Sequence, residues 1–152
     1  MQPISGVLYN HVLFAAMLGW FVAQGLKIPI YHHIEHEWDF SRFHGSGGMP
    51  SSHSSMVVAT AVMCGGIAGF DSPVFALSVA LACIVMFDAL GVRRETGTQA
   101  VVINQILKDV LINGKQISNE ELKELVGHTP LEVAAGAVLG LIIGVVYLLI
   151  LF

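Results

Sequence analysis

The sequence predicts an all-α membrane protein: a bundle of about four transmembrane helices, with interfacial helices on the cytoplasmic side. Apolar residues make up 55% of the 152 residues and charged residues only 12%, about half the share in an average soluble protein. The mean hydropathy is +0.73. The charged residues are also unevenly placed, so that some stretches of about 20 residues contain one or none. We expect residues 1–152 to form a single membrane-embedded domain.

Four segments are apolar and long enough to be considered as membrane spans, since a helix needs about 20 predominantly apolar residues to cross the bilayer. They are Ile4–Leu26, Ser54–Phe70, Pro73–Val92 and Leu131–Phe152. The second is short, and it spans only if the preceding Ser51–His53 is also helical. Between the second and third, Ser72 can cap a helix and Pro73 can take its first position, which predicts a tight helical hairpin.

The positive charges predict the orientation of these spans. If all four cross, residues 27–50 and 93–130 form loops on one side, while the termini and the turn at Asp71 lie on the other. All seven lysines and arginines fall on the two-loop side. The positive-inside bias therefore predicts a multi-pass protein whose two loops are cytoplasmic. The net charge of −4 excludes a basic nucleic-acid binder, so no nucleic-acid partner is expected.

The second loop and the fourth span carry helix signals of their own. Apolar residues recur at helical spacing over residues 102–111, which predicts an interfacial helix. Ser118 and Glu121 form a capping-box pattern for a short helix that ends at Gly127. Thr129 and Glu132 give the same pattern at the start of the fourth span. Glycines at every fourth position of that span predict close helix packing, either within the chain or in a homo-oligomer.

Three polar clusters stand at the ends of spans on the predicted cytoplasmic side. The first, residues 45–55, is a glycine-rich turn leading into a helix N-terminus, where N–H groups and hydroxyls can bind an anion; the alternative is a serine-capped helix after a flexible loop. In the second, Arg93 and Arg94 offer planar forks that match phosphate oxygens, although arginines beside a span often only set its orientation.

The third cluster is His128 and Glu132 at the start of the fourth span. Glu132 could orient the His128 ring, or it could serve only the capping box. The convergence of a serine turn, two histidines and two arginines on one membrane face favours a phosphoryl-transfer site at a lipid headgroup.

The same residues resemble a known family. Pro50-Ser51-Ser52-His53 resembles the P-S-G-H motif of type 2 phosphatidic acid phosphatases and vanadium haloperoxidases, and His128-x-x-x-Glu132 resembles the H-x-x-x-D of their third motif. Three longer motifs, G-G-M-P-S-S-H-S, D-A-x-G-V-R-R-x-x-G-x-Q-A and G-H-T-P-x-E-V, resemble the divergent branch of that superfamily, which consists of small integral membrane proteins. The resemblance runs from about residue 27 to residue 140.

The resemblance implies a helical bundle and a phosphatase site that works through a phosphohistidine without a required metal or other cofactor. It implies that His128 is the nucleophile, His53 the general acid and Glu132 the residue that orients His128. The phosphate-binding residues would be Lys27, Arg42, Gly48, Ser51, Ser52, Arg93 and Arg94. The chain departs from the motifs at Ser52, where they have glycine, at Glu132, where they have aspartate, and at Leu122, where they have an arginine that Arg93 or Arg94 would have to replace.

We therefore expect a lipid phosphatase that acts on a lipid phosphomonoester or diphosphate at the cytoplasmic leaflet, surrounded by membrane lipids. A non-catalytic lipid-phosphate binding or transport protein would keep the same anion site. A metal-dependent hydrolase is a further alternative, since His32 and His36 would share a helix face near a carboxylate. The segment around them, with His33, Tyr31 and Trp38, equally fits a titratable stretch at headgroup level.

Overall fold

The computed structural model describes residues 4–43, 45, 47–111 and 128–152, and this part of the chain contains helices but no β-strand. Two short 3₁₀ helices, η1 (Ile4–Tyr9) and η2 (Phe40–Phe43), accompany the α-helices. The α-helices are α1 (His11–Glu35), α2 (Ser52–Ala68), α3 (Pro73–Leu90), α4 (Val92–Leu111) and α5 (Pro130–Leu151). The predicted all-α membrane fold is confirmed, because α1, α3 and α5 are each long and apolar enough to cross a bilayer.

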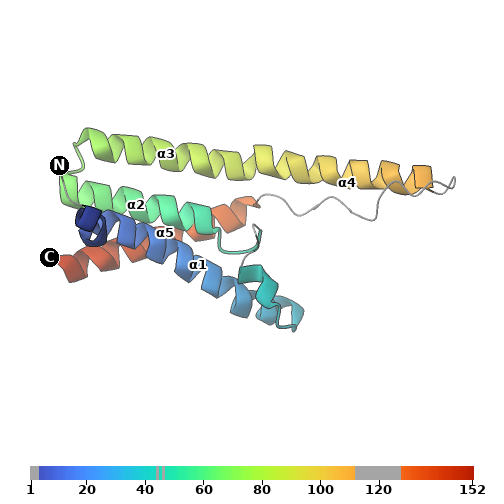
Figure 1. Cartoon of the computed structure of the whole chain (residues 1–152), viewed down its shortest axis with the longest axis horizontal. Coiled ribbons are helices and arrows are strands. Elements are labelled where there is room, and N and C mark those ends of the chain that lie inside the picture. The colour runs from blue at the N-terminus through green and yellow to red at the C-terminus, as the bar shows by residue number, and fades with distance from the viewer. Residues whose placement is uncertain (1–3, 44, 46, 112–127) are drawn as a thin grey trace.

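The fourth apolar helix, α2, occupies the middle of the bundle. It is 17 residues long and packs against α1, α3 and α5 (Figure 1). Its buried residues are mostly small, such as Ser55, Ala59 and Gly65. Small side chains let three neighbouring helices approach one central helix closely, which is the packing that membranes favour.

The glycines of α5 provide the closest of these approaches. A Cβ atom added at Gly136 or Gly140 would overlap the carbonyl oxygen of Ser51 or Ser55 on α2, and one at Gly144 would lie 2.7 Å from Cβ of Val62. The predicted close packing therefore occurs within the chain, between α2 and α5.

The predicted bounds of the first span are wrong. Residues 4–9 form η1, and α1 begins at His11 because the side chain of Asn10 accepts a hydrogen bond from the Leu13 amide at 3.1 Å. The helix then continues past residue 26 to Glu35, where His36 takes a left-handed conformation (φ 60°) and ends it. Lys27 therefore lies inside a helix rather than at the start of a loop.

The predicted amphipathic helix in the second loop is also longer than expected, since α4 begins at Val92, immediately after Gly91. It continues beyond the bundle along the direction of α3 (Figure 1). Its apolar residues Val101, Val102 and Ile106 are exposed, whereas Asn104 on the other face is buried. The predicted helix over 118–127 lies outside the described residues.

The predicted hairpin between α2 and α3 is confirmed, with Ser72 as the cap of α3 and Pro73 in its first turn. This turn, η1 and the end of α5 lie at one end of the bundle (Figure 1). The opposite end holds the end of α1, the start of α2, the junction of α3 with α4 and the start of α5. The parts of the three polar clusters that the structure describes are thus gathered at one end.

Candidate active site

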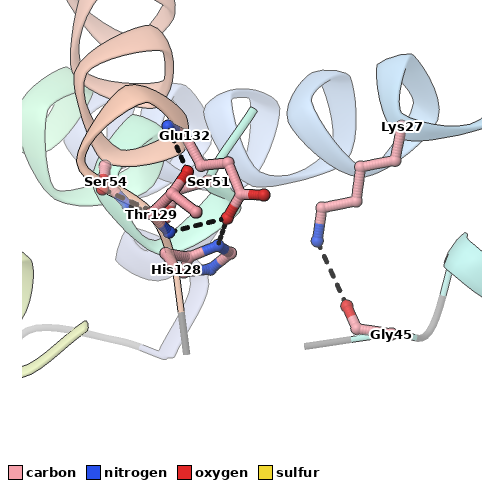
Figure 2. A network of polar contacts seen from close by, with 7 residues as sticks. All are labelled: Lys27, Gly45, Ser51, Ser54, His128, Thr129 and Glu132. Carbon is pink, nitrogen blue, oxygen red and sulfur yellow. Dashed lines mark hydrogen bonds and ion pairs between the residues drawn. The ribbon is translucent and has the colours of Figure 1, made fainter. Parts of the chain in front are cut away.

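The best-defined polar arrangement at this end is a histidine–glutamate pair at the start of α5 (Figure 2). His128 is 3% exposed, and its Nδ1 lies 3.0 Å from Oε2 of Glu132. The same carboxylate oxygen accepts a hydrogen bond from the Thr129 amide at 3.0 Å, and the Thr129 hydroxyl accepts one from the Glu132 amide at 3.3 Å. Glu132 therefore forms the capping box and holds the imidazole at once, so the two sequence interpretations are compatible.

Backbone hydrogen bonds fix this pair relative to two other helices. The His128 amide donates to the carbonyl of Ala89 near the end of α3 at 3.1 Å, and the Ser51 amide at the start of α2 donates to the carbonyl of Glu132 at 3.0 Å. Three helix ends are thus joined around one imidazole. These bonds hold the backbone of His128 in place, and the contact of Nδ1 with Glu132 orients the ring.

A cavity of about 600 Å³ opens beside the pair, a size typical of small-molecule sites. Its walls come from α1, η2, the segment between η2 and α2, α4, and the start of α5 with the two residues before it. Five of the predicted site residues line it: Lys27, Arg42, Gly48, His128 and Glu132. Residues far apart in the sequence therefore meet at one cavity.

Lys27 is the most buried cation on the cavity wall among the described residues, with 2% of its surface exposed. Its Nζ donates a hydrogen bond to the carbonyl of Gly45 at 3.1 Å, and it interacts electrostatically with Glu132 and Arg42. Figure 2 shows the ammonium and the Glu132 carboxylate extending toward one another from α1 and α5. An ammonium group has three donors, so an additional anion can be bound while the Gly45 contact is kept.

Arg42 is held in place before any ligand arrives. Its Nε lies 3.1 Å from Oδ2 of Asp39, and its guanidinium lies 4.2 Å from the centroid of the Tyr31 ring. The Ser41 hydroxyl, which donates to Asp39 at 2.6 Å, is the main reason that the pKa of this carboxyl is below its usual value. The hydrogen bond and attraction of Arg42 lower it further, so the pair remains charged at neutral pH.

His53 lies beside His128 rather than on the cavity wall. The two ring centroids are 6.2 Å apart, the ring planes make an angle of 61°, and His53 is half-buried in the first turn of α2. This places the two predicted catalytic histidines next to one another.

The serines of the predicted phosphate turn are buried and also do not line the cavity. The Ser51 hydroxyl accepts hydrogen bonds from the amide and hydroxyl of Ser54, at 3.4 and 3.1 Å, and so caps α2. Gly48 does line the cavity, and its φ of +89° is one that glycine adopts without strain. The side chains of Arg93 and Arg94 lie outside the part of the chain that the structure describes, although their backbone forms the first turn of α4.

Several residues of the cavity wall are not among those predicted from the sequence. Tyr31 and Glu35 come from the last turns of α1, and Thr98 comes from α4. A signal for the first two is present in the sequence, since residues 24, 27, 31 and 35 recur at helical spacing along one face. The polarity of the residues after position 26 interrupts the apolar run and hides this continuation of the helix.

The histidines near the end of α1 do not have the arrangement that a metal site would require, with His32 and His36 on one helix face. The His32 ring stacks on Trp38 at 4.0 Å, and His36 lies beyond the helix rather than on a shared face. Among the described residues, no three histidine, cysteine, aspartate or glutamate side chains converge as metal ligands would. Their arrangement therefore gives no support to the metal-dependent alternative.

Comparison with known proteins agrees with the motifs. Residues 8–143 match the family described as the Divergent PAP2 family. The chain belongs to this family. A relative in Bacillus subtilis (strain 168), named uncharacterized membrane protein YuiD, is 37% identical over 150 residues, which cover 92% of this chain and 95% of the relative. No solved structure matches the chain.

Membership in the divergent PAP2 family confirms the resemblance found in the three motifs. Together with the apolar helices, the membrane-protein relative shows that the chain is a membrane protein. His128, the histidine of the G-H-T-P-x-E-V segment that carries the resemblance, is buried at the site.

Proposed function

We propose that this protein is a lipid phosphate phosphatase that hydrolyses a phosphomonoester or diphosphate of a membrane lipid through a phosphohistidine. The single observation that carries the proposal is the buried His128–Glu132 pair on the wall of a cavity that Lys27 and Arg42 also line. Cations beside an oriented imidazole are what transfer of a phosphoryl group to nitrogen requires. Family membership supports the same chemistry.

In the first step, Nε2 of neutral His128 attacks phosphorus while the bond to the lipid oxygen breaks. Glu132 at Nδ1 stabilises the positive charge that develops on the ring. Lys27 and Arg42, with Arg93 or Arg94, neutralise the phosphoryl oxygens. His53, as an imidazolium, gives its proton to the departing lipid alkoxide.

In the second step, water attacks phosphorus, the neutral His53 accepts its proton, and the P–N bond breaks. Inorganic phosphate leaves, and both histidines return to their starting states. The proximity of the two rings supports this division of labour, because one phosphoryl group must be within reach of both.

The test is phosphate release by the purified protein in detergent from phosphatidic acid, phosphatidylglycerol phosphate and a polyprenyl diphosphate. We expect hydrolysis of at least one of them, and a loss of at least about 10³-fold in His128→Ala because the attacking atom is removed. His33→Ala is the matched control, since His33 does not line the cavity, and it should keep nearly full activity. Wild-type protein that binds these lipids without releasing phosphate would instead support a non-catalytic binder.

Glu132→Gln separates the two roles of this residue. Glutamine can still complete the capping box, so the thermal unfolding midpoint should change little. The rate should fall by about 10²-fold or more, because the phosphorylated imidazole loses its carboxylate. An acid-labile phosphoenzyme from radiolabelled substrate should accumulate more slowly in Glu132→Gln and not at all in His128→Ala. An unchanged rate in Glu132→Gln would leave this residue a purely structural role.

A further inference from the structure

The connecting segment between α1 and α2 (residues 39–43, 45, 47 and 48) carries two of the predicted phosphate-binding residues, Arg42 and Gly48, on the cavity wall. Side chains of α1 contact this segment at Trp20, Gln24, Lys27 and Tyr31. These positions recur every three or four residues, so they lie on one face of the helix. The connecting segment is therefore attached to α1 along one row of side chains.

Gln24 makes the shortest contact in this row. Its Nε2 donates a hydrogen bond at 2.7 Å to the carbonyl of Phe43, the residue that follows Arg42. About one turn later, Lys27 donates to the carbonyl of Gly45 at 3.1 Å. Two neighbouring donors of α1 thus hold two backbone carbonyls of the connecting segment, but only Lys27 is also a cation that a phosphoryl group would attract.

Packing alone does not account for a glutamine at position 24. The residue is 4% exposed in the middle of a helix that is apolar enough to cross the bilayer. Its Oε1 has no hydrogen-bond partner among the described residues. A buried polar atom without a partner costs free energy, so an apolar side chain of the same length would suit the packing of α1 better. The hydrogen bond from Nε2 to Phe43 is the contact that distinguishes Gln24 from such a side chain.

Arg42 requires a support because Lys27 repels it. The two cations interact electrostatically, and like charges disfavour this arrangement when no anion lies between them. The ion pair of Arg42 with Asp39 lies within the connecting segment, so it does not attach that segment to the bundle. The Tyr31 ring of α1 attracts the guanidinium but makes no directional bond to it. The bond from Gln24 is directional, and because Gln24 is uncharged, this bond does not depend on the presence of an anion.

We propose that Gln24 is a positioning residue of the anion site. By holding the carbonyl of Phe43, it keeps Arg42 close enough to Lys27 for both cations to bind one phosphoryl group. The inference rests on the proposed function, which assigns the phosphoryl oxygens to these two cations. It adds a residue that touches neither substrate nor the reacting atoms and acts through the backbone of the connecting segment.

A double-mutant cycle in the full-length protein tests this role. Gln24→Met keeps the length of the side chain but removes the donor, and Arg42→Met removes the cation that Gln24 is proposed to position. The matched control is Tyr147→Phe, which removes another polar contact of α1, the one between His11 and Tyr147 at the opposite end of the bundle. Equilibrium binding of radiolabelled inorganic phosphate is measured in detergent for the three single variants and for the double variant of Gln24 and Arg42.

We expect Gln24→Met to weaken phosphate binding by about 10-fold, since a small displacement of a binding group can cost up to about 10²-fold. In the Arg42→Met background, the same change should cost less than about twofold, because the cation that it displaces is already absent. Tyr147→Phe should bind phosphate as wild type does. In the hydrolysis assay, Gln24→Met should raise KM and leave kcat within about threefold, because Arg42 binds the phosphoryl oxygens both before and during the reaction.

Unchanged phosphate binding in Gln24→Met would overturn the inference. So would an equal loss in both backgrounds or in Tyr147→Phe, since Gln24 would then only support the fold. If Gln24→Met does not fold, Gln24→Asn takes its place, because an amide one methylene shorter does not reach Phe43 without movement, and the same outcomes decide. Wild-type protein that binds phosphate but hydrolyses no lipid phosphate would refute the proposed function, and the binding cycle would still test Gln24. Wild-type protein that binds no phosphate would overturn the anion site and the inference with it.

Discussion

Glu132 shows how one side chain at this site can serve folding and chemistry together. Its Oε2 accepts the Thr129 amide that the start of α5 leaves without a helical partner, and the same oxygen holds Nδ1 of His128. The capping box thereby holds the Glu132 carboxylate where it contacts the imidazole of His128. For the neighbouring histidine, His53, we propose a role as general acid, whose contribution would depend on the leaving group.

His53→Ala should discriminate between substrates with good and poor leaving groups. A lipid alkoxide needs a proton to depart, a contribution of about 10²- to 10⁴-fold, whereas p-nitrophenolate leaves almost unaided. In single-turnover phosphorylation, the variant should therefore lose far more rate on phosphatidic acid than on p-nitrophenyl phosphate. Single turnover is required because His53 is also the proposed base of the second step. If the phosphorylation rate falls equally on both substrates, His53 is not the general acid. It would then bind phosphate or stabilise the start of α2.

At the scale of elements, the contact between α2 and α5 determines where the site residues lie. The carbonyl of Ser51 meets Gly136, and the carbonyl of Ser55 meets Gly140. Because the start of α2 carries His53 and the start of α5 carries Glu132, any separation of these helices would also separate His53 from the His128–Glu132 pair.

Gly140→Ala should therefore destabilise the protein. The added methyl group would overlap the backbone of α2, and such overpacking costs about 1–3 kcal/mol. The matched control is Gly25→Ala in α1, where the new Cβ would have no neighbour within 4 Å. That change should be neutral or stabilising by about 0.5–1 kcal/mol, because alanine favours a helix. Thermal unfolding in detergent measures both, and equal midpoints would contradict the close approach of α2 and α5.

At the scale of the whole molecule, Lys27, Arg42 and the backbone of Arg93 and Arg94 lie at the same end of the bundle as the candidate site. All seven lysines and arginines lie in or beyond the last turns of α1, in the segment before α2, or between α3 and α5. By the positive-inside bias we predict that this end is cytoplasmic and that the α2–α3 turn lies on the opposite side.

Single cysteines can test this orientation in a variant without Cys64 and Cys83. A cysteine at Glu37, exposed beyond α1, should be protected from a membrane-impermeant thiol reagent in intact cells. A cysteine at Asp71, exposed in the α2–α3 turn, should be labelled. Permeabilised cells provide the control, since both positions should then react. The reverse pattern in intact cells would place the site on the outer face.

The class of fold, the helical hairpin at Ser72 and the cap at Thr129 can be predicted from the sequence, because apolar length and capping are properties of adjacent residues. The motifs of the sequence also identified the family. The placement of the Lys27 ammonium depends on tertiary structure, since its hydrogen-bond acceptor is the carbonyl of Gly45, 18 residues away. Tertiary structure likewise decided that Ile34 and Val102 line one cavity with His128. A cavity wall depends on which helix faces meet across the bundle, and local spacing does not contain that information.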